Sequence, residues 1–179
     1  MNPFEALPLY SESRMAEYKD KALGRAPPHV YAVAEQAYAR MQRTGTNQAV
    51  VMSGESGAGK TETNKHLMHF LIWRAGTAAG REHLSEDILR TNPVLESLGN
   101  AKTIGNNNSS RFGKYLELAF APGSNSICGA KFKTFLLEKS RVAHQAPSER
   151  NFHAFYLLLA GADANLRERL GHRQPAEPQ

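Results

Sequence analysis

An eight-residue segment of this chain has the residue types and the spacing that a phosphate-binding loop requires. It reads Gly54-Glu55-Ser56-Gly57-Ala58-Gly59-Lys60-Thr61 and fits the pattern G-x-x-x-x-G-K-[ST]. Glycines let backbone N–H groups turn towards phosphate oxygens, and a lysine at this position places its charge on the β- and γ-phosphates. A hydroxyl in the last position can ligate Mg²⁺. The segment therefore predicts a nucleotide site in which Lys60 holds phosphate and Thr61 holds the metal.

A second polar segment, residues 106–114, carries groups that could sense the terminal phosphate of a nucleotide. It reads Asn-Asn-Asn-Ser-Ser-Arg-Phe-Gly-Lys and leads straight into a predicted strand. Hydroxyls can hold a metal ion and an attacking water, amides can polarise phosphate oxygens, and a loop ordered by the γ-phosphate can act as a switch. The alternative is an ordinary turn, which asparagine and serine both favour. The phosphate loop upstream favours the sensor.

The elements beside the phosphate loop are those that would position it. Residues 48–53 contain the apolar run Ala49–Met52 and are predicted as a buried strand. Residues 61–74 are predicted as a helix that Gly76 ends, and residues 29–43 as an earlier amphipathic helix. A glycine turn that merely precedes a helix is the alternative, but the strand–loop–helix order favours phosphate binding.

The remaining segments predict further helices and one hairpin. Residues 1–28 are predicted to be an irregular entry segment, and residues 171–179 a disordered tail. A helix from residue 86 is predicted to break at Pro93 and to restart through Leu98. The other predicted elements are strands at 114–121 and 127–138, joined as a hairpin, and helices at 151–160 and 165–170.

Composition narrows the class of protein. The 179 residues are 41% hydrophobic and 22% charged, which is ordinary for a soluble globular domain and excludes a wholly disordered chain. No apolar run approaches the roughly 20 residues of a membrane span. The formal net charge is +5 without a long basic run, so a nucleic-acid-binding arm is not favoured. The single cysteine, Cys128, excludes an internal disulfide and a multi-cysteine zinc site.

Taken in order along the chain, the two motifs and their flanking segments resemble the myosin motor domain. The phosphate loop with the following Glu62 is similar to the family's nucleotide loop, and residues 101–114 are similar to its switch I. Kinesins share this loop-and-switch logic but not the flanking segments. Those segments are Asn2–Tyr10, which is similar to the family's purine-binding stretch, Ala26–His29, Leu137–Val142 and Glu149–Tyr156.

The resemblance implies an α/β fold of the P-loop NTPase type, as in myosins and kinesins, with an incomplete mixed sheet flanked by helices. Residues 1–170 would be a partial motor domain with a purine-binding segment, phosphate loop, switch I and transducer hairpin. The implied function is the ATP-binding part of an actin-based motor, with ATP and Mg²⁺ as cofactors. Implied partners are actin filaments, through regions mostly outside this sequence, and light chains only in the full protein. The implied location is the cytoplasm and its actin cytoskeleton, and neither nucleic acid nor a membrane span is expected.

The resemblance also implies roles for individual residues. Asn2, Pro3, Phe4 and Tyr10 would line the base pocket. The loop residues that would bind the nucleotide are Gly54, Glu55, Ser56, Gly57, Ala58, Gly59, Lys60, Thr61 and Glu62. The catalytic set would be Lys60 and Asn106 on the phosphates, Ser109 on the lytic water, Ser110 on Mg²⁺ with Thr61, and Arg111 in a gate to a switch II glutamate. Ala6 stands where the family often has a basic residue, which predicts weaker adenine contacts.

Switch II itself is not found in these 179 residues. It is an Asp-x-x-Gly-Phe-Glu-type element, and none of the three aspartates, Asp20, Asp87 and Asp163, is followed by glycine three residues later. We therefore expect this chain to be a segment of an actin-activated Mg-ATPase, and we expect the segment to be inactive on its own. The alternative is a non-catalytic, truncated fragment that binds nucleotide or regulates a partner.

Two other patterns have simpler explanations. The run Tyr156–Asp163 is loosely like the Walker B strand of a generic NTPase, but its aromatic and leucine residues follow helical spacing, which favours a helix. Glu62, His66 and His69 share a helix face at metal-ligand spacing. A stripe that is solvated or covered by a partner is favoured there over a metal site.

Overall fold

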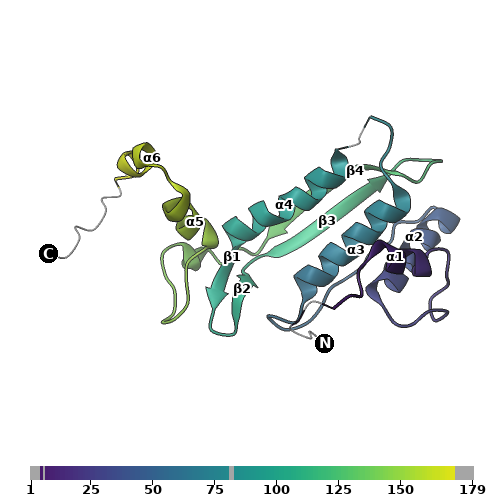
Figure 1. The fold of residues 1–179 in the computed structure, drawn as a ribbon, viewed down its shortest axis with the longest axis horizontal. Coiled ribbons are helices and arrows are strands. Elements are labelled where there is room, and N and C mark those ends of the chain that lie inside the picture. The colour runs from purple at the N-terminus through teal and green to yellow at the C-terminus, as the bar shows by residue number, and fades with distance from the viewer. Residues whose placement is uncertain (1–4, 6, 81–82, 172–179) are drawn as a thin grey trace. The chain divides into compact units, whose positions relative to one another are not determined.

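The computed structural model describes residues 5, 7–80 and 83–171, and the chain divides into two compact units (Figure 1). The first unit is formed by residues within 1–91 and 114–133, and the second by residues within 92–113 and 134–179. The helices are α1 (Glu12–Tyr18), α2 (Val30–Thr44), α3 (Lys60–Ala75), α4 (Leu84–Gly99), the 3₁₀ helix η1 (Lys139–Val142), α5 (His153–Gly161) and α6 (Ala164–Arg169). The strands are β1 (Asn100–Thr103), β2 (Asn106–Ser110), β3 (Gly113–Phe120) and β4 (Ile127–Phe135).

Helices α1, α2 and α3 share one apolar core in the first unit. Its buried members are Met15, Tyr18, Tyr31, Ala32, Ala34, Leu67 and Phe70. The predicted helices at 29–43 and 61–74 are confirmed, and Gly45 ends α2 in the left-handed conformation with φ 65°. The prediction that residues 1–28 are irregular is wrong, because α1 lies within them. Ser11 caps α1, and Met15 and Tyr18, three residues apart, bury one side of this short helix.

The predicted hairpin is confirmed as β3 paired with β4. Leu116, Leu118 and Phe120 pack on the core formed by Met68, Ile88 and Ile127, while Tyr115 is exposed. This is the alternation expected of a half-buried strand. Strand β4 ends at Phe135 rather than at residue 138, because the chain turns at Leu136, whose φ is 55°.

Two predictions about regular structure are wrong. Residues 48–53 are not a strand: within the described part of the chain nothing pairs with them, and Val51 is 85% exposed. An extended segment becomes a strand only when a neighbour accepts and donates its backbone hydrogen bonds. Pro93 does not break α4, which runs through it as one helix. Ile88 and Asn92, in the helical turn that precedes Pro93, are buried, and this packing outweighs the single backbone hydrogen bond that proline removes.

The second unit contains a small antiparallel sheet that was not predicted. Strand β1 pairs with β2, in the register Asn100 with Ser110 and Ala101 with Ser109. Asparagine and serine have low strand propensity, so the composition of residues 106–110 does not indicate a strand. Phe152 is buried and bridges to Ala101, just ahead of α5.

Helices α5 and α6 confirm the two helices predicted near the C-terminus. The run Tyr156–Asp163 is therefore not a Walker B strand, and Asp163 instead caps α6 by accepting a 2.7 Å hydrogen bond from the Leu166 N–H. Of the tail predicted at residues 171–179, residues 172–179 lie outside the described residues. Among the helices of the described ranges, none is long and apolar enough to cross a membrane.

Acidification is expected to destabilise the first unit. Burial lowers the pKa of His29 and of His66 below their ordinary value of 6.5, so the folded chain favours the neutral rings. His29 caps α2 through Nδ1, which accepts from the Tyr31 N–H and can do so only unprotonated. This stabilisation is fully present above about pH 6.5 and is lost as the pH falls through the lowered folded-state values.

Thermal melting at about pH 7.5 and pH 5.5 measures this effect. His29→Asn keeps a capping side chain that does not titrate, so it should reduce the fall in melting temperature. An equal fall in wild type, His29→Asn and His66→Gln would contradict the assignment.

Candidate functional site

Glycines give the phosphate loop its backbone shape. Gly54, Gly57 and Gly59 have φ values of 151°, 78° and 92°, which side-chain-bearing residues rarely adopt. A Cβ on Gly54 would lie only 3.2 Å from the Cβ of Ala58. The loop is closed by a turn in which the Ala58 N–H donates to the Glu55 carbonyl at 3.2 Å. The backbone therefore forms a tight, glycine-dependent cradle directly ahead of α3.

Lys60 and the start of α3 supply the positive end of this cradle. The Lys60 Nζ donates to the Gly54 carbonyl at 2.6 Å and to the Glu55 carbonyl at 2.7 Å, so the ammonium crosses the loop. Gly59 is the N-cap of the 16-residue α3 and provides no side-chain cap for its first amides. Uncapped helix amides, left-handed glycines and an ammonium group form the donor set that binds phosphate. Thr61, half-buried in the first turn, carries the hydroxyl that suits a magnesium ion.

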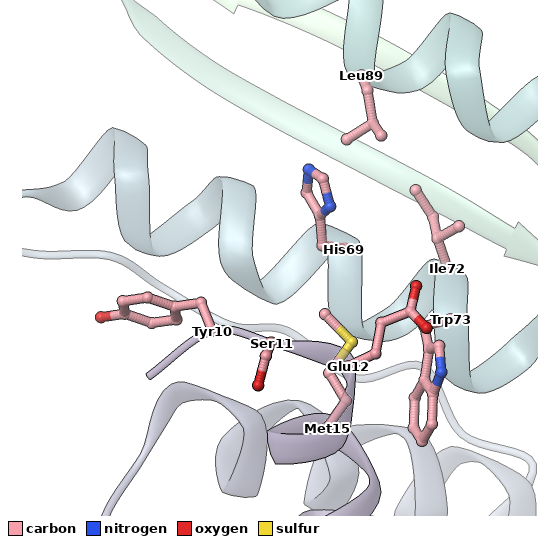
Figure 2. A pocket seen from close by; sticks show the side chains of 8 residues that line it. All are labelled: Tyr10, Ser11, Glu12, Met15, His69, Ile72, Trp73 and Leu89. Carbon is pink, nitrogen blue, oxygen red and sulfur yellow. The ribbon is translucent and has the colours of Figure 1, made fainter. Parts of the chain in front are cut away.

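Tyr10 lies against α3 beyond the loop. Its ring stacks on the imidazole of His66, with 3.5 Å between ring centroids and 5° between the planes. Tyr10 also lines two cavities, of about 460 Å³ and 270 Å³, and shares both with His69. Figure 2 shows the larger cavity, with His69, Ile72 and Trp73 on α3 and Tyr10, Ser11, Glu12 and Met15 on the N-terminal segment.

Glu62, His66 and His69 on one face of α3 have different surroundings, and Glu62 and His69 are exposed. Glu62 pairs with Lys65 at 2.8 Å, and His66 stacks on Tyr10. In the part of the chain that the structure describes, no group of three or more His, Cys, Asp or Glu residues could hold a metal ion.

The second polar segment forms β2, and strand geometry separates its two serines. Ser109 is 2% exposed, whereas the neighbouring Ser110 is exposed, because successive side chains of a strand point to opposite faces. Asn106 accepts a 2.9 Å hydrogen bond from the Asn108 N–H. The Asn108 side chain in turn contacts Asn100, Glu96 and His153, which fixes the middle of the strand.

Arg111 follows β2 and is held by a carboxylate of the same unit. Its Nε donates to Glu138, and its Nη1 donates to the Ser109 hydroxyl at 3.3 Å. Glu138 also accepts from the Arg141 Nε at 2.8 Å, and Arg141 reaches Glu149 at 2.9 Å. These hydrogen bonds hold the pKa of Glu138 below its ordinary value, with Arg141 contributing more than Arg111. We call Arg111, Glu138, Arg141 and Glu149 the arginine–glutamate cluster.

The backbone around Arg111 is fixed on both sides. The Arg111 N–H donates to the Gly99 carbonyl, and its carbonyl accepts from the Glu138 N–H, each at 2.9 Å. A Cβ on Gly99 would meet the Phe112 ring at 2.4 Å, and one on Gly113 would meet the Phe135 ring at 2.3 Å. Two aromatic rings therefore pack directly on the backbone of Gly99 and Gly113. Together with the two backbone hydrogen bonds, they hold the main chain at Arg111 in place.

The predicted site residues are distributed over the two units. Gly54 to Glu62 form one continuous loop and helix start in the first unit, together with Tyr10, while Asn106 to Arg111 form β2 and its end in the second. Asn2, Pro3 and Phe4 lie outside the described residues. Sequence reasoning missed Glu138, Arg141 and Glu149, although all three lie in segments that carried the resemblance. Their opposite charges were the available signal, but the pairing joins residues up to 27 positions apart.

A phosphate loop leading directly into a long helix is typical of the large class of P-loop proteins. A family model described as "Myosin head (motor domain)" matches residues 1–177. The chain is 46% identical to Myosin-VIIa of Drosophila melanogaster over 170 residues, which cover 95% of this chain and 8% of the relative. It is 48% identical to Myosin-1 of Neosartorya fischeri over 176 residues, 98% of this chain and 14% of the relative. It is 47% identical to Myosin type-2 heavy chain 1 of Schizosaccharomyces pombe over 171 residues, 95% of this chain and 11% of the relative.

The chain belongs to the myosin head (motor domain) family. It spans less than a sixth of the length of each of these relatives. Relatives named as different kinds of myosin match it at nearly equal identity, so this segment does not separate those kinds.

Proposed function

We propose that this chain is the ATP-binding part of an actin-based motor, and that Gly54–Thr61 binds the phosphates of Mg·ATP. The observation that carries the proposal is the match to the myosin head family over residues 1–177, with a tight glycine loop at the required position. In the complete protein, ATP hydrolysis would be coupled to movement along actin filaments in the cytoplasm. Residues 1–170 would then be part of one motor domain.

The residues of the loop have distinct tasks in this proposal. Lys60 exchanges two neutral carbonyl partners for anionic phosphate oxygens, so that donor and acceptor carry opposite charges. The glycines allow backbone N–H groups of the loop to turn inward, and the first turn of α3 adds its uncapped amides. Glu62 places its negative charge in the first turn of α3. Tyr10, with Asn2, Pro3 and Phe4, forms the base pocket.

The metal and the switch use hydroxyl, amide and guanidinium groups. Mg²⁺, when bound, neutralises charge on the β- and γ-phosphates. Thr61 and Ser110 would hold it, Asn106 would contact phosphate, and Ser109 would orient the lytic water. Arg111 would form the gate to a switch II glutamate. The alternation along β2 supports this division, because Ser109 and Ser110 face opposite sides of the strand.

We also propose that residues 48–53 and the β3–β4 hairpin belong to a mixed sheet of the P-loop NTPase type. The exposed Val51 and the unpaired backbone of residues 48–53 are consistent with a strand that pairs with further motor sequence, since the relatives are much longer. In that sheet the hairpin would act as the transducer.

Titration with a fluorescent ATP analogue in the presence of Mg²⁺ tests the proposal. We expect saturable binding that unlabelled ATP displaces and that weakens when Mg²⁺ is chelated. An absence of displaceable binding by a chain that melts cooperatively would overturn it.

The purified 179-residue chain is expected to bind ATP without turning it over at a motor's rate, with or without actin. Phosphoryl transfer depends on fixed donors around the γ-phosphate, and removing one such donor typically reduces the rate by about 10²–10³-fold. None of Asp20, Asp87 and Asp163 begins the Asp-x-x-Gly element of switch II, which would supply donors on the other side of the γ-phosphate. Phosphate release, with Lys60→Ala as the control, measures this. Lys60-dependent turnover stimulated by filamentous actin would contradict the expectation and would make Asp163 the first residue to test.

A further inference from the structure

The larger cavity beside α3 lies entirely within the first unit, and two separate apolar cores hold its walls. Met15 on α1 belongs to the core shared by α1, α2 and α3, and Trp73 on α3 packs against that core. Ile72, also on α3, packs against the second core, which contains Ile88 of α4. Leu89, next to Ile88, forms the α4 side of the cavity. The walls are therefore formed by the fold itself, as is usual for small-molecule sites.

The cavity has the size and the lining of a site for a small organic molecule. Its volume of about 460 Å³ lies within the range of ligand pockets, which are mostly apolar with a few polar groups. Figure 2 shows Tyr10 and Trp73 at opposite ends, with Glu12 on the side of Trp73. Met15 and Leu89 add aliphatic surface between them. An aromatic or aliphatic body suits this lining, because its burial removes apolar surface from water.

The charge of the lining selects the polar end of such a ligand. Glu12 is anionic, and neither lysine nor arginine lines the cavity. No ion pair of the described residues involves Glu12, whereas Glu17 on the same helix pairs with Arg14 at 2.8 Å. The Ser11 hydroxyl and the His69 imidazole are the other polar side chains with hydrogen-bonding groups on this lining beside the rings. A carboxylate without a cation of its own, at the edge of an aromatic cavity, favours a ligand that carries an ammonium group.

We propose that this cavity binds an amphipathic amine: an aromatic ring enters between Tyr10 and Trp73, and the protonated amino group pairs with Glu12. Burial of the ring supplies most of the affinity, and the ion pair supplies the preference for a cation over a neutral molecule of the same shape. Nearby aromatic rings add to that preference, because their faces attract cations. The site is separate from the phosphate loop and does not depend on the proposed function.

Titration with phenylbutylamine, and separately with its neutral analogue phenylbutanol, tests the site. Trp73 is the only tryptophan of the chain, so tryptophan fluorescence reports directly on this cavity. We expect a saturable change with both compounds, and a dissociation constant about three- to tenfold lower for the amine. Glu12→Gln keeps the shape of the side chain and should remove this difference. Glu117→Gln is the matched control, because it removes the same charge from a residue that pairs with Lys133 on the hairpin, and it should keep the difference.

Three results would overturn the proposal. The first is the absence of a saturable change in Trp73 fluorescence with either compound. The second is an equal dissociation constant for the amine and the alcohol, a comparison that uses the unsubstituted chain and does not depend on the folding of a variant. The third is an equal loss of amine affinity in Glu12→Gln and Glu117→Gln, which would assign the preference to net charge rather than to Glu12. None of these measurements contains a nucleotide, so their outcome is separate from the Lys60→Ala titration that tests the proposed function.

Discussion

Replacing Lys60 by alanine is expected to weaken ATP binding by about 3 kcal/mol, which is roughly 150-fold in dissociation constant. The ammonium group crosses the loop within 2.7 Å of two carbonyls, so it is already positioned where phosphate oxygens would bind. Its replacement removes a charge-assisted contact to a triphosphate and adds no steric obstacle. Titration of a fluorescent ATP analogue against both forms measures the loss.

Two comparisons make this result specific to the loop. Lys133→Ala removes a lysine that pairs with Glu117 on the hairpin, and it should leave ATP affinity within about twofold of wild type. The melting temperature of Lys60→Ala should stay close to that of wild type, because Lys60 bonds only to carbonyls at the loop surface. Equal ATP affinity of wild type and Lys60→Ala would refute the assignment of Gly54–Thr61.

Replacing Arg74 by alanine is expected to destabilise the chain by about 3–5 kcal/mol. Arg74 donates from Nε to Glu35 at 2.9 Å and from Nη2 to Asp20 at 2.5 Å, and Glu35 is 1% exposed. The guanidinium also lies 4.9 Å from the centroid of the Tyr38 ring. Removing it leaves the Glu35 carboxylate buried without a cation, next to the core shared by α2 and α3. Urea or thermal unfolding followed by circular dichroism measures the change.

The size of the Arg74 effect depends on burial, so an exposed arginine provides the control. Arg90, 77% exposed and paired with Glu86 one helical turn away, should lose no more than about 0.5 kcal/mol on replacement by alanine. Replacing the pair together, as Arg74→Met with Glu35→Leu, should recover most of the stability, because no buried charge remains. A loss for Arg74→Ala no larger than that for Arg90→Ala would show that the ion pairs of Arg74 with Glu35 and Asp20 do not support the fold.

The local elements of this protein could be predicted because their signals are local. Helices α2 and α3 have apolar residues at helical spacing and each is followed by a glycine, and the hairpin has alternating side chains around a turn. The phosphate loop is equally local, since eight consecutive residues contain its glycines, lysine and hydroxyl. In each case the information lies in residues that are close together in the sequence, where spacing alone decides which side chains share a face.

Predictions failed where the outcome depended on a distant neighbour. Residues 48–53 have the composition of a buried strand, but a strand requires a partner, and no described segment pairs with them. Pro93 has the local signature of a helix break, yet burial of Ile88 and Asn92 keeps α4 continuous. Strand β2 was not predicted from the asparagine- and serine-rich residues 106–110, because it forms by pairing with β1.

The sequence by itself determined the family, the position of the phosphate loop and most of the helices, because these depend on the order and spacing of nearby residues. Only the tertiary structure decided which charges meet. Three ion pairs join residues that are far apart in the chain. Arg74 pairs with Glu35, 39 positions away, and with Asp20, 54 positions away, and Arg111 pairs with Glu138, 27 positions away. The chain offers many arginines and glutamates that could pair, and an ion pair becomes strong and specific only where packing excludes water from it. Packing is a property of the folded chain, so the partner of Arg111 could not be read from the motif that contains it.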